Sequence, residues 1–116
     1  MFNIILPWPS IILSPNARKH WAVIAKEKKI YRETCYYQAK AQGATQLDCD
    51  KINVNFLFSP PSKRRIDLDN CIARIKSGID GIADAIKIDD SNWKMAFEFS
   101  GNTGGFIEVK ICSIKN

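Results

Sequence analysis

Hydrophobic and polar residues alternate most regularly at residues 51–58, where the sequence reads KINVNFLF. Successive side chains of an extended chain point to opposite faces, so this alternation predicts a strand with one buried face. The residues on that face are Ile52, Val54, Phe56 and Phe58. The apolar segment NIIL at residues 3–6 predicts an earlier strand, which should end at LPWPS because proline cannot donate to a sheet.

A stripe of isoleucines predicts a helix within DNCIARIKSGIDGIADAI, residues 69–86. The isoleucines recur at steps of three and four residues, which places them on one side of a helix. They are Ile72, Ile75, Ile79, Ile82 and Ile86. Stripes at this spacing usually pack against other elements, so we expect this one to lie in the core or in a dimer interface.

A second helix is expected from about Lys26 to Gln42, a segment without proline or glycine. Its apolar face recurs at helical spacing, with lysines and arginines on the opposite side: Ile30, Thr34, Tyr37 and Ala41. The preceding residues KHWAVI are compatible with either a helix or an extended chain. The pattern therefore predicts an amphipathic helix but leaves its first turn open.

The C-terminal part predicts two strands, near residues 92–99 and 105–114. The segment SGNTGG between them suits a turn with positive φ, so we expect a hairpin. The resulting β-α-β-α-β-β order predicts an α+β fold, with a mixed sheet packed by two helices. A chain of 116 residues, 46% of them hydrophobic, is typical of one domain, here residues 1–116.

Two features argue against a zinc site and against a membrane anchor. The four cysteines lie far apart and form no CxxC pair and no cluster with His20. We expect them to be reduced thiols: Cys35, Cys49, Cys71 and Cys112. The N-terminal MFNIILPWPSIIL carries no basic lead, is broken by Pro7 and Pro9, and is too short to span a bilayer. These features predict a cytoplasmic protein without a membrane partner.

Positive charge gathers in residues 16–40 of a chain whose formal net charge is +5. Only Glu27 and Glu33 oppose the cations of this segment, which are Arg18, Lys19, Lys26, Lys28, Lys29, Arg32 and Lys40. A basic face is typical of a phosphate-binding surface, but a solvated lysine-rich helix has the same composition. The charge pattern alone leaves both interpretations open.

The stretch KRRIDLDN, residues 63–70, places two aspartates where a loop enters the isoleucine helix. Residues two apart in an extended chain point the same way, so Asp67 and Asp69 can converge on one hard cation. Magnesium takes oxygen ligands and keeps water positions open for a phosphate. A third carboxylate would come from Asp89 or Asp90, in the IDDS segment after the helix.

Local geometry does not give this convergence, because the helix separates its two ends by roughly 25 Å. Either the helix breaks early at Gly78 or Gly81, or the acidic pair of a second subunit completes the site. In the alternative interpretation, Asp69 is an N-cap, Asp67 pairs with Arg65, and the later acidic pair only forms a turn.

The chain resembles the RusA family of Holliday junction resolvases, which are small endodeoxyribonucleases of phages and prophages. The resemblance covers most of the chain and rests on the ordered segments LPWPS, SPNARKHWAV, KKIYRE, KRRIDLDN, DGIADAI and IDDS. It implies an α+β homodimer that binds four-way DNA junctions and cuts them with Mg²⁺, for which Mn²⁺ would substitute. By the same resemblance, the metal-binding and catalytic carboxylates are Asp67, Asp69 and Asp90.

One position departs from the family pattern, which often has a lysine four residues after the second aspartate of the D-x-D motif. Here that residue is Ala73. Lys76 lies a helical turn further on, on the same side as Asp69, and is the expected catalytic stand-in. Arg74 is the second candidate. The departure leaves open a protein that binds junctions but cuts them poorly.

Cations next to the aspartates are expected to hold DNA while the carboxylates hold metal. The expected DNA-binding residues are Lys63, Arg64, Arg65, Asn70, Arg74, Arg18, Lys19, Lys26, Lys28, Lys29 and Arg32. A non-catalytic nucleic-acid-binding module is the alternative function, in which the basic surface acts alone. A structural protein of a phage particle is a third interpretation, and it predicts neither metal dependence nor strong salt dependence.

Overall fold

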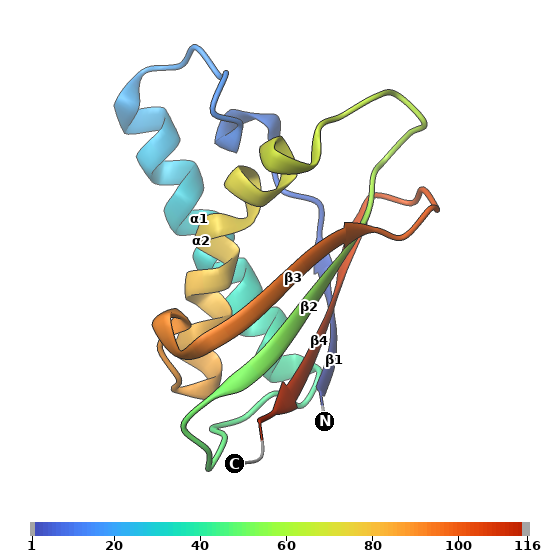
Figure 1. The fold of residues 1–116 in the computed structure, drawn as a ribbon. Helices are drawn as coiled ribbons and strands as arrows, with labels where there is room; N and C mark the ends of the chain where they lie inside the picture. The colour runs from blue at the N-terminus through green and yellow to red at the C-terminus, as the bar shows by residue number, and fades with distance from the viewer. Residues whose placement is uncertain (1, 115–116) are drawn as a thin grey trace.

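A mixed sheet with two long helices on one of its faces forms the body of the protein (Figure 1). The computed structural model describes residues 2–114. Within them the elements are β1 (Phe2–Pro7), η1 (Ile11–Leu13), α1 (Trp21–Ala41), β2 (Ile52–Ser59), α2 (Leu68–Ile86), η2 (Asp90–Asn92), β3 (Trp93–Phe99) and β4 (Phe106–Ser113). The predicted α+β class and β-α-β-α-β-β order are confirmed.

The sheet has the strand order β1-β4-β2-β3, so the predicted hairpin of the last two strands is wrong. Strand β3 pairs parallel with β2, whereas β4 lies antiparallel between β1 and β2. The glycine-rich connection makes this crossing possible because it passes over the end of β2. The backbone N–H groups of Gly104 and Gly105 donate to Pro60 and Ser59 (both 2.9 Å), with positive φ at both glycines.

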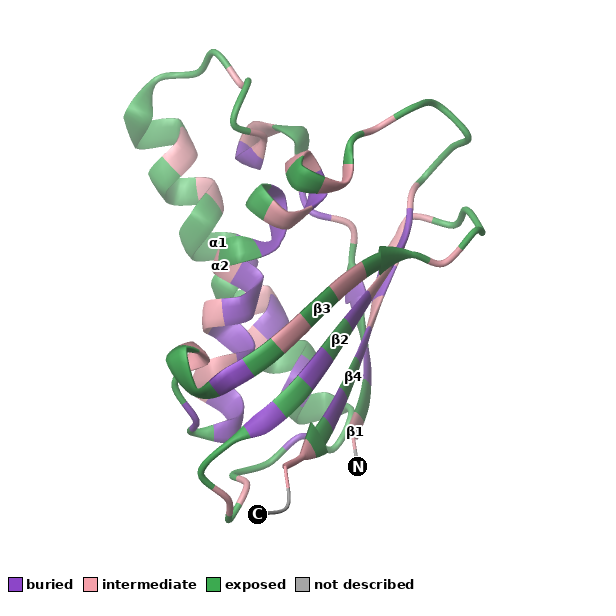
Figure 2. Cartoon of the chain, viewed as in Figure 1, coloured by how far each residue is buried: buried purple, intermediate pink, exposed green. Residues whose placement is uncertain are grey.

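The core lies between the sheet and the helices, where the buried residues of Figure 2 face one another. The alternating face predicted for β2 is fully buried. The isoleucine stripe of α2 is also core: Ile75, Ile79, Ile82 and Ile86 are at most 2% exposed, and Ile72 is half-buried. Burial of these side chains attaches α2, and the residues at its ends, firmly to the sheet.

Helix α1 differs from the prediction in its start and in its buried face. It begins at Trp21, where the Nδ1 atom of His20 accepts a hydrogen bond from the N–H of Ala22 (3.2 Å). Its buried residues are Tyr31, Cys35 and Ala39. The face predicted to be apolar points outward instead, with Ile30 45% and Tyr37 67% exposed.

Two glycines of α2 explain which face of α1 is buried. The helix runs through Gly78 and Gly81 without a break, so of the two alternatives left open by the sequence, an early break at these glycines is wrong. A Cβ atom at Gly78 would lie 2.6 Å from Cε2 of Tyr31, and one at Gly81 would clash with the carbonyl oxygen of Arg32. The glycines therefore allow the two helices to pack in close contact, and this contact selects the Tyr31 face of α1.

No helix within residues 2–114 combines the length and the apolar character that a transmembrane segment needs.

Candidate functional site

Asp67 and Asp69 lie at the start of α2 with their carboxylates exposed. Asp67 is the N-cap residue, but its side chain makes no capping hydrogen bond. Asp69 already belongs to the first helical turn, where its Oδ1 accepts from the N–H of Asn70 (3.0 Å). The two aspartates therefore straddle the helix boundary and do not share one extended segment, as the sequence had suggested.

The ion pair expected in the alternative interpretation is present but weak. Arg65 Nε lies 3.9 Å from Asp67 Oδ1, and both side chains are largely exposed, at 94% and 72%. Exposed pairs at such distances contribute little to stability. Neither capping nor pairing thus ties up the Asp67 carboxylate, which remains available to a ligand.

Asp90 does not reach the start of α2, but it returns to the middle of that helix. Its Oδ2 accepts from Lys76 Nζ at 2.6 Å, and this hydrogen bond is the main cause of a raised pKa of Lys76. Lys76 also lies 3.5 Å from Asp80 Oδ1. At 1.5 Å per residue, Lys76 stands about 10 Å along the helix axis from Asp69. Because the chain folds back after α2, Asp90 lies closer to Asp69 than the length of the helix, roughly 25 Å, would suggest.

The reversal after α2 has a local cause. Lys87 ends the helix in the left-handed conformation, at φ 63°. Trp93 then donates from Nε1 to the carbonyl of Ile88 (3.0 Å), which fixes the short connection. Asp89 caps η2 by accepting from the N–H of Ser91 (3.0 Å), and its hydrogen bonds to Ser91 lower the pKa of Asp89. Of the acidic pair, Asp90 is the one that faces α2.

The three predicted carboxylates do not form one ligand set within a single chain. Among residues 2–114, no group of three or more His, Cys, Asp or Glu side chains is close enough to hold a metal ion. Asp67 and Asp69 offer the oxygen donors that magnesium prefers. Asp90 meets the surface of α2 at Lys76, with which it forms an ion pair. The donor types fit Mg²⁺, whereas the third carboxylate is held by a lysine.

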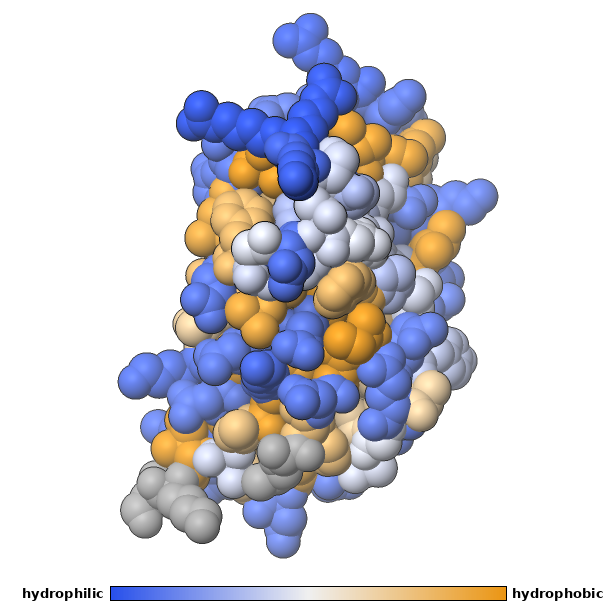
Figure 3. All heavy atoms as spheres, turned by 90° about the vertical axis from the view of Figure 1, so that its right-hand side faces the viewer, coloured by the Kyte–Doolittle hydropathy of each residue, from blue (hydrophilic) through white to orange (hydrophobic). Residues whose placement is uncertain are grey.

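The basic residues before α2 stand on a loop that projects from the sheet (Figure 1). Lys63, Arg64 and Arg65 are all exposed. Figure 3 shows strongly hydrophilic side chains projecting at the same end of the molecule. Three exposed cations beside exposed carboxylates form a surface that suits a polyanion and a divalent ion together.

Arg74 lies inside the protein, contrary to the expected exposed DNA contact. It is 7% exposed, its Nη2 donates to the carbonyl of Pro9 (2.6 Å), and its guanidinium lies 5.8 Å from the ring centre of Trp8. Burial lowers the pKa of Arg74. Of the two cations considered as substitutes for the lysine missing at Ala73, Lys76 is therefore the one that meets Asp90.

The basic residues predicted within residues 16–40 are exposed, and one of them, Arg32, forms an ion pair with a carboxylate. Arg32 donates from Nε and Nη2 to both oxygens of Asp84 (2.8 and 2.9 Å), which lowers the pKa of Asp84. Lys28 and Lys29 line a cavity of about 750 Å³ between α1, η1 and α2, which Lys76 also lines. Three further cations close to these in the sequence are also exposed, namely Arg18, Lys19 and Lys26. The cavity links this basic face to the acidic side of α2.

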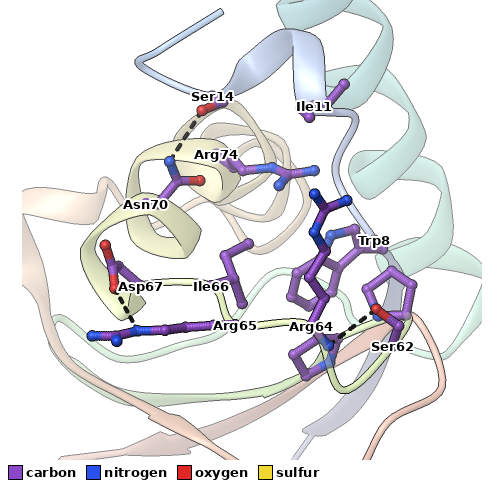
Figure 4. A pocket seen from close by; sticks show the side chains of 12 residues that line it. Trp8, Ile11, Ser14, Ser62, Arg64, Arg65, Ile66, Asp67, Asn70 and Arg74 are labelled. Carbon is purple, nitrogen blue, oxygen red and sulfur yellow. Dashed lines mark hydrogen bonds and ion pairs between the residues drawn. The ribbon is translucent and has the colours of Figure 1, made fainter.

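Sequence reasoning missed the contribution of the N-terminal segment to the site. A cavity of about 520 Å³ opens beside the Asp67 carboxylate (Figure 4). Its wall includes Trp8 and Ser14, and Asn70 donates from Nδ2 to Ser14 Oγ (3.0 Å). The segments LPWPS and SPN each appeared in the sequence pattern, but periodicity could not show that they fold against KRRIDLDN.

Comparison with known proteins gives one informative match and no family. No family model matches the chain. It is 41% identical over 93 residues to a protein of Xylella fastidiosa (strain Temecula1 / ATCC 700964) that is described as uncharacterized. The match covers 78% of this chain and 61% of that relative. The chain thus spans less than two thirds of the relative's length, and the match carries no activity.

Proposed function

We propose that this chain is a magnesium-dependent, structure-specific endodeoxyribonuclease of the RusA type, which resolves four-way DNA junctions in the cytoplasm of a bacterial cell. The observation that carries the proposal is the exposed pair Asp67 and Asp69 beside a loop of three exposed cations, in which the Asp67 carboxylate makes no capping hydrogen bond. A capping or turn role would instead engage the carboxylate oxygens of Asp67 with backbone N–H groups.

The residues of the site have separate roles in this proposal. Arg64 and Arg65 bind the phosphates next to the scissile bond, and Asp67 and Asp69 hold the metal. Magnesium held there would supply a Lewis acid and a water of lowered pKa. In the hydrolysis, the water oxygen bonds to phosphorus, the bond from phosphorus to one sugar oxygen breaks, and that oxygen leaves as an alcohol with a proton from the water. When a phosphate approaches, Lys76 exchanges Asp90 for the anion, and the released Asp90 becomes the third carboxylate.

Paired cutting of a junction requires two sites, so the proposal includes a homodimer. A two-fold axis relates two copies of a site in the way that the opposed strands of a junction are related. The basic segments of both subunits then act on one DNA molecule. Affinity should fall steeply with salt, because counterions are released when the protein binds phosphates.

A non-catalytic module that binds branched DNA is the second candidate. Two observations favour it: Lys76 already neutralises Asp90, and the described residues contain no group of three metal-binding side chains. Such a module would bind junctions through the basic loop with or without a divalent ion.

Cleavage of an end-labelled four-way junction with Mg²⁺, with Mn²⁺ or with EDTA separates the two candidates. The nuclease predicts paired cuts that both metals support and EDTA abolishes. Asp69→Asn should abolish cutting and leave junction binding intact, because it removes a ligand charge and little shape. Asp50→Asn is the matched control, since Asp50 is an exposed aspartate in the loop before β2, at the other end of the molecule (Figure 1). Normal cutting by Asp69→Asn would exclude the metal site.

A further inference from the structure

The cavity beside Asp67 has an aromatic and aliphatic floor and cationic walls (Figure 4). Trp8, Ile11, Pro60 and Pro61 supply the apolar part of its lining. The cations come from two different elements, the β2–α2 loop and α2 itself. Its volume, about 520 Å³, lies within the usual range for a small-molecule site.

Arg74 is the feature that points to a ligand. Its side chain is more than nine-tenths buried, yet within residues 2–114 it makes no ion pair with a carboxylate. Nη2 donates to the Pro9 carbonyl, and Nε has no hydrogen-bond partner. A buried cation without a counter-charge is costly, so an anion in the cavity would stabilise it.

Arg64 lines the same cavity from the opposite side. In Figure 4 its side chain extends across the cavity toward Trp8 and the side from which Arg74 enters, whereas Arg65 turns away toward Asp67. Asp67 is the one carboxylate among the lining residues, and Arg65 lies 3.9 Å from it. The part of the cavity over Trp8 is thus left with two guanidinium groups, which favour a phosphate.

We propose that this cavity binds a single unpaired nucleotide, with its phosphate between Arg64 and Arg74 and its base against the apolar floor at Trp8. Aromatic side chains accept unpaired bases by stacking and apolar contact, which is tolerant of sequence. A base within a duplex could not enter a cavity of this kind, so the occupant is a nucleotide that has left the stack. That this nucleotide comes from a branch point rests on the proposed function. The proposal goes beyond nuclease activity, because it concerns binding that needs no metal.

The test is an NMR titration of the full chain in EDTA, with thymidine monophosphate as the probe. The indole N–H signal of Trp8 is assigned by its loss in Trp8→Phe. We expect the monophosphate to shift this signal, and both deoxythymidine and inorganic phosphate to bind roughly tenfold more weakly, since each lacks one half of the contacts. Binding of deoxythymidine or of inorganic phosphate as tight as that of the monophosphate, or no shift at Trp8, would overturn the proposal.

Variants test the cationic wall without risking the fold. Arg64 is exposed, so the Arg64→Gln variant should fold normally. Its affinity for thymidine monophosphate should be roughly tenfold lower than that of the native chain. Lys94→Gln removes the same charge from an exposed position on β3 and should bind as the native chain does. An equal loss of affinity in both variants would show that only the net charge of the protein matters, and it would refute the proposed role of Arg64 in the cavity.

The same titration separates this inference from the proposed nuclease. If the chain binds the nucleotide but does not cut a junction, nucleotide binding in the cavity is supported and the nuclease proposal is refuted. If the chain cuts junctions but the Trp8 signal does not shift, the nuclease proposal is supported and nucleotide binding in the cavity is refuted.

Discussion

At the scale of single residues, Lys76 is the cation that joins the middle of α2 to the acidic turn after it. It contacts Asp90 at 2.6 Å and Asp80 at 3.5 Å, with 61% of its side chain exposed. Such a partly exposed amine can change partners at little cost, because water compensates each contact that it gives up. Lys76 can therefore bind a carboxylate in the free protein and a phosphate in the complex.

This role predicts the behaviour of Lys76→Met. Removing a cation near developing negative charge should slow junction cleavage by about a hundredfold and change junction affinity little. Lys51→Met, at an exposed position before β2, is the charge-matched control. Adding Ala73→Lys to Lys76→Met should recover part of the rate if the lysine has moved along the helix. A normal rate for Lys76→Met would remove Lys76 from the mechanism.

The pair of Arg32 and Asp84 predicts a pH dependence of stability. The pKa of Asp84 is lowered below its ordinary 3.8, so the pair stabilises the fold above that pH and loses this contribution as the pH falls through the lowered pKa. Because the pair is half-exposed, Asp84→Asn should lower the melting temperature by only about 2 to 4 °C at pH 6. The difference from the native chain should shrink toward pH 3. A difference that grows in acid would contradict the assignment.

Single residues also mark the limit of sequence reasoning at the site. Two exposed aspartates beside a basic loop could be read from KRRIDLDN because neighbours in sequence stay neighbours in space. The burial of Arg74 could not, because it depends on the carbonyl of Pro9 and the ring of Trp8, more than sixty residues earlier in the chain. Pattern assigns charge to a helix face, but only tertiary packing decides whether that charge is covered.

At the scale of elements, the contact of α1 with α2 determines how the basic and acidic surfaces are arranged. Gly81 lets the backbone of α2 approach the Arg32 carbonyl, and Gly78 accepts the ring of Tyr31. The helical period of α2 was readable because its isoleucines face one large core. The buried face of α1 could not be predicted in this way, because it consists only of Tyr31, Cys35 and Ala39, while the larger apolar residues of the helix point outward.

Gly81→Ala tests this contact. In an exposed helix interior, the change would stabilise by up to about 1 kcal/mol, since alanine is the better helix former. Here the added methyl group meets the Arg32 carbonyl, so we expect destabilisation of roughly 1 to 3 kcal/mol. Urea unfolding at one pH measures the sign. Stabilisation would show that the helices do not pack as closely as described.

At the scale of the whole molecule, the sheet order brings distant segments together around one end. Element types were predictable from periodicity, whereas strand order was not, because the chain passes over β2 before β4 pairs with it. The cavity at Trp8 follows from the same topology, since β1 leads directly into the segment that meets the β2–α2 loop. A site assembled in this way has no signature within any one segment.

The outward stripe of α1 is the surface on which we expect the proposed dimer to form. Val23, Ile30 and Tyr37 recur every seven residues and are 44%, 45% and 67% exposed. A seven-residue apolar repeat is the spacing by which two helices pack along one another. At about 100° per residue, Lys28 and Arg32 lie about 160° and 200° round the helix from Ile30, so a second copy docked on the stripe would leave these two cations open to DNA. Lys26 lies only about 40° from Ile30 and would border the interface.

Light scattering at micromolar concentration, applied to two matched variants, tests this interface. Ile30→Glu should give monomers and abolish paired cutting within one junction, because a charge in an apolar seam stays unpaired. Ile5→Glu introduces the same charge at an equally exposed isoleucine on β1 (43%) and should leave a dimer. Dissociation by Ile5→Glu alone would move the interface to the sheet. A native chain that is strictly monomeric yet makes paired cuts would rule out the dimer itself, since one small site cannot reach two opposed strands at once.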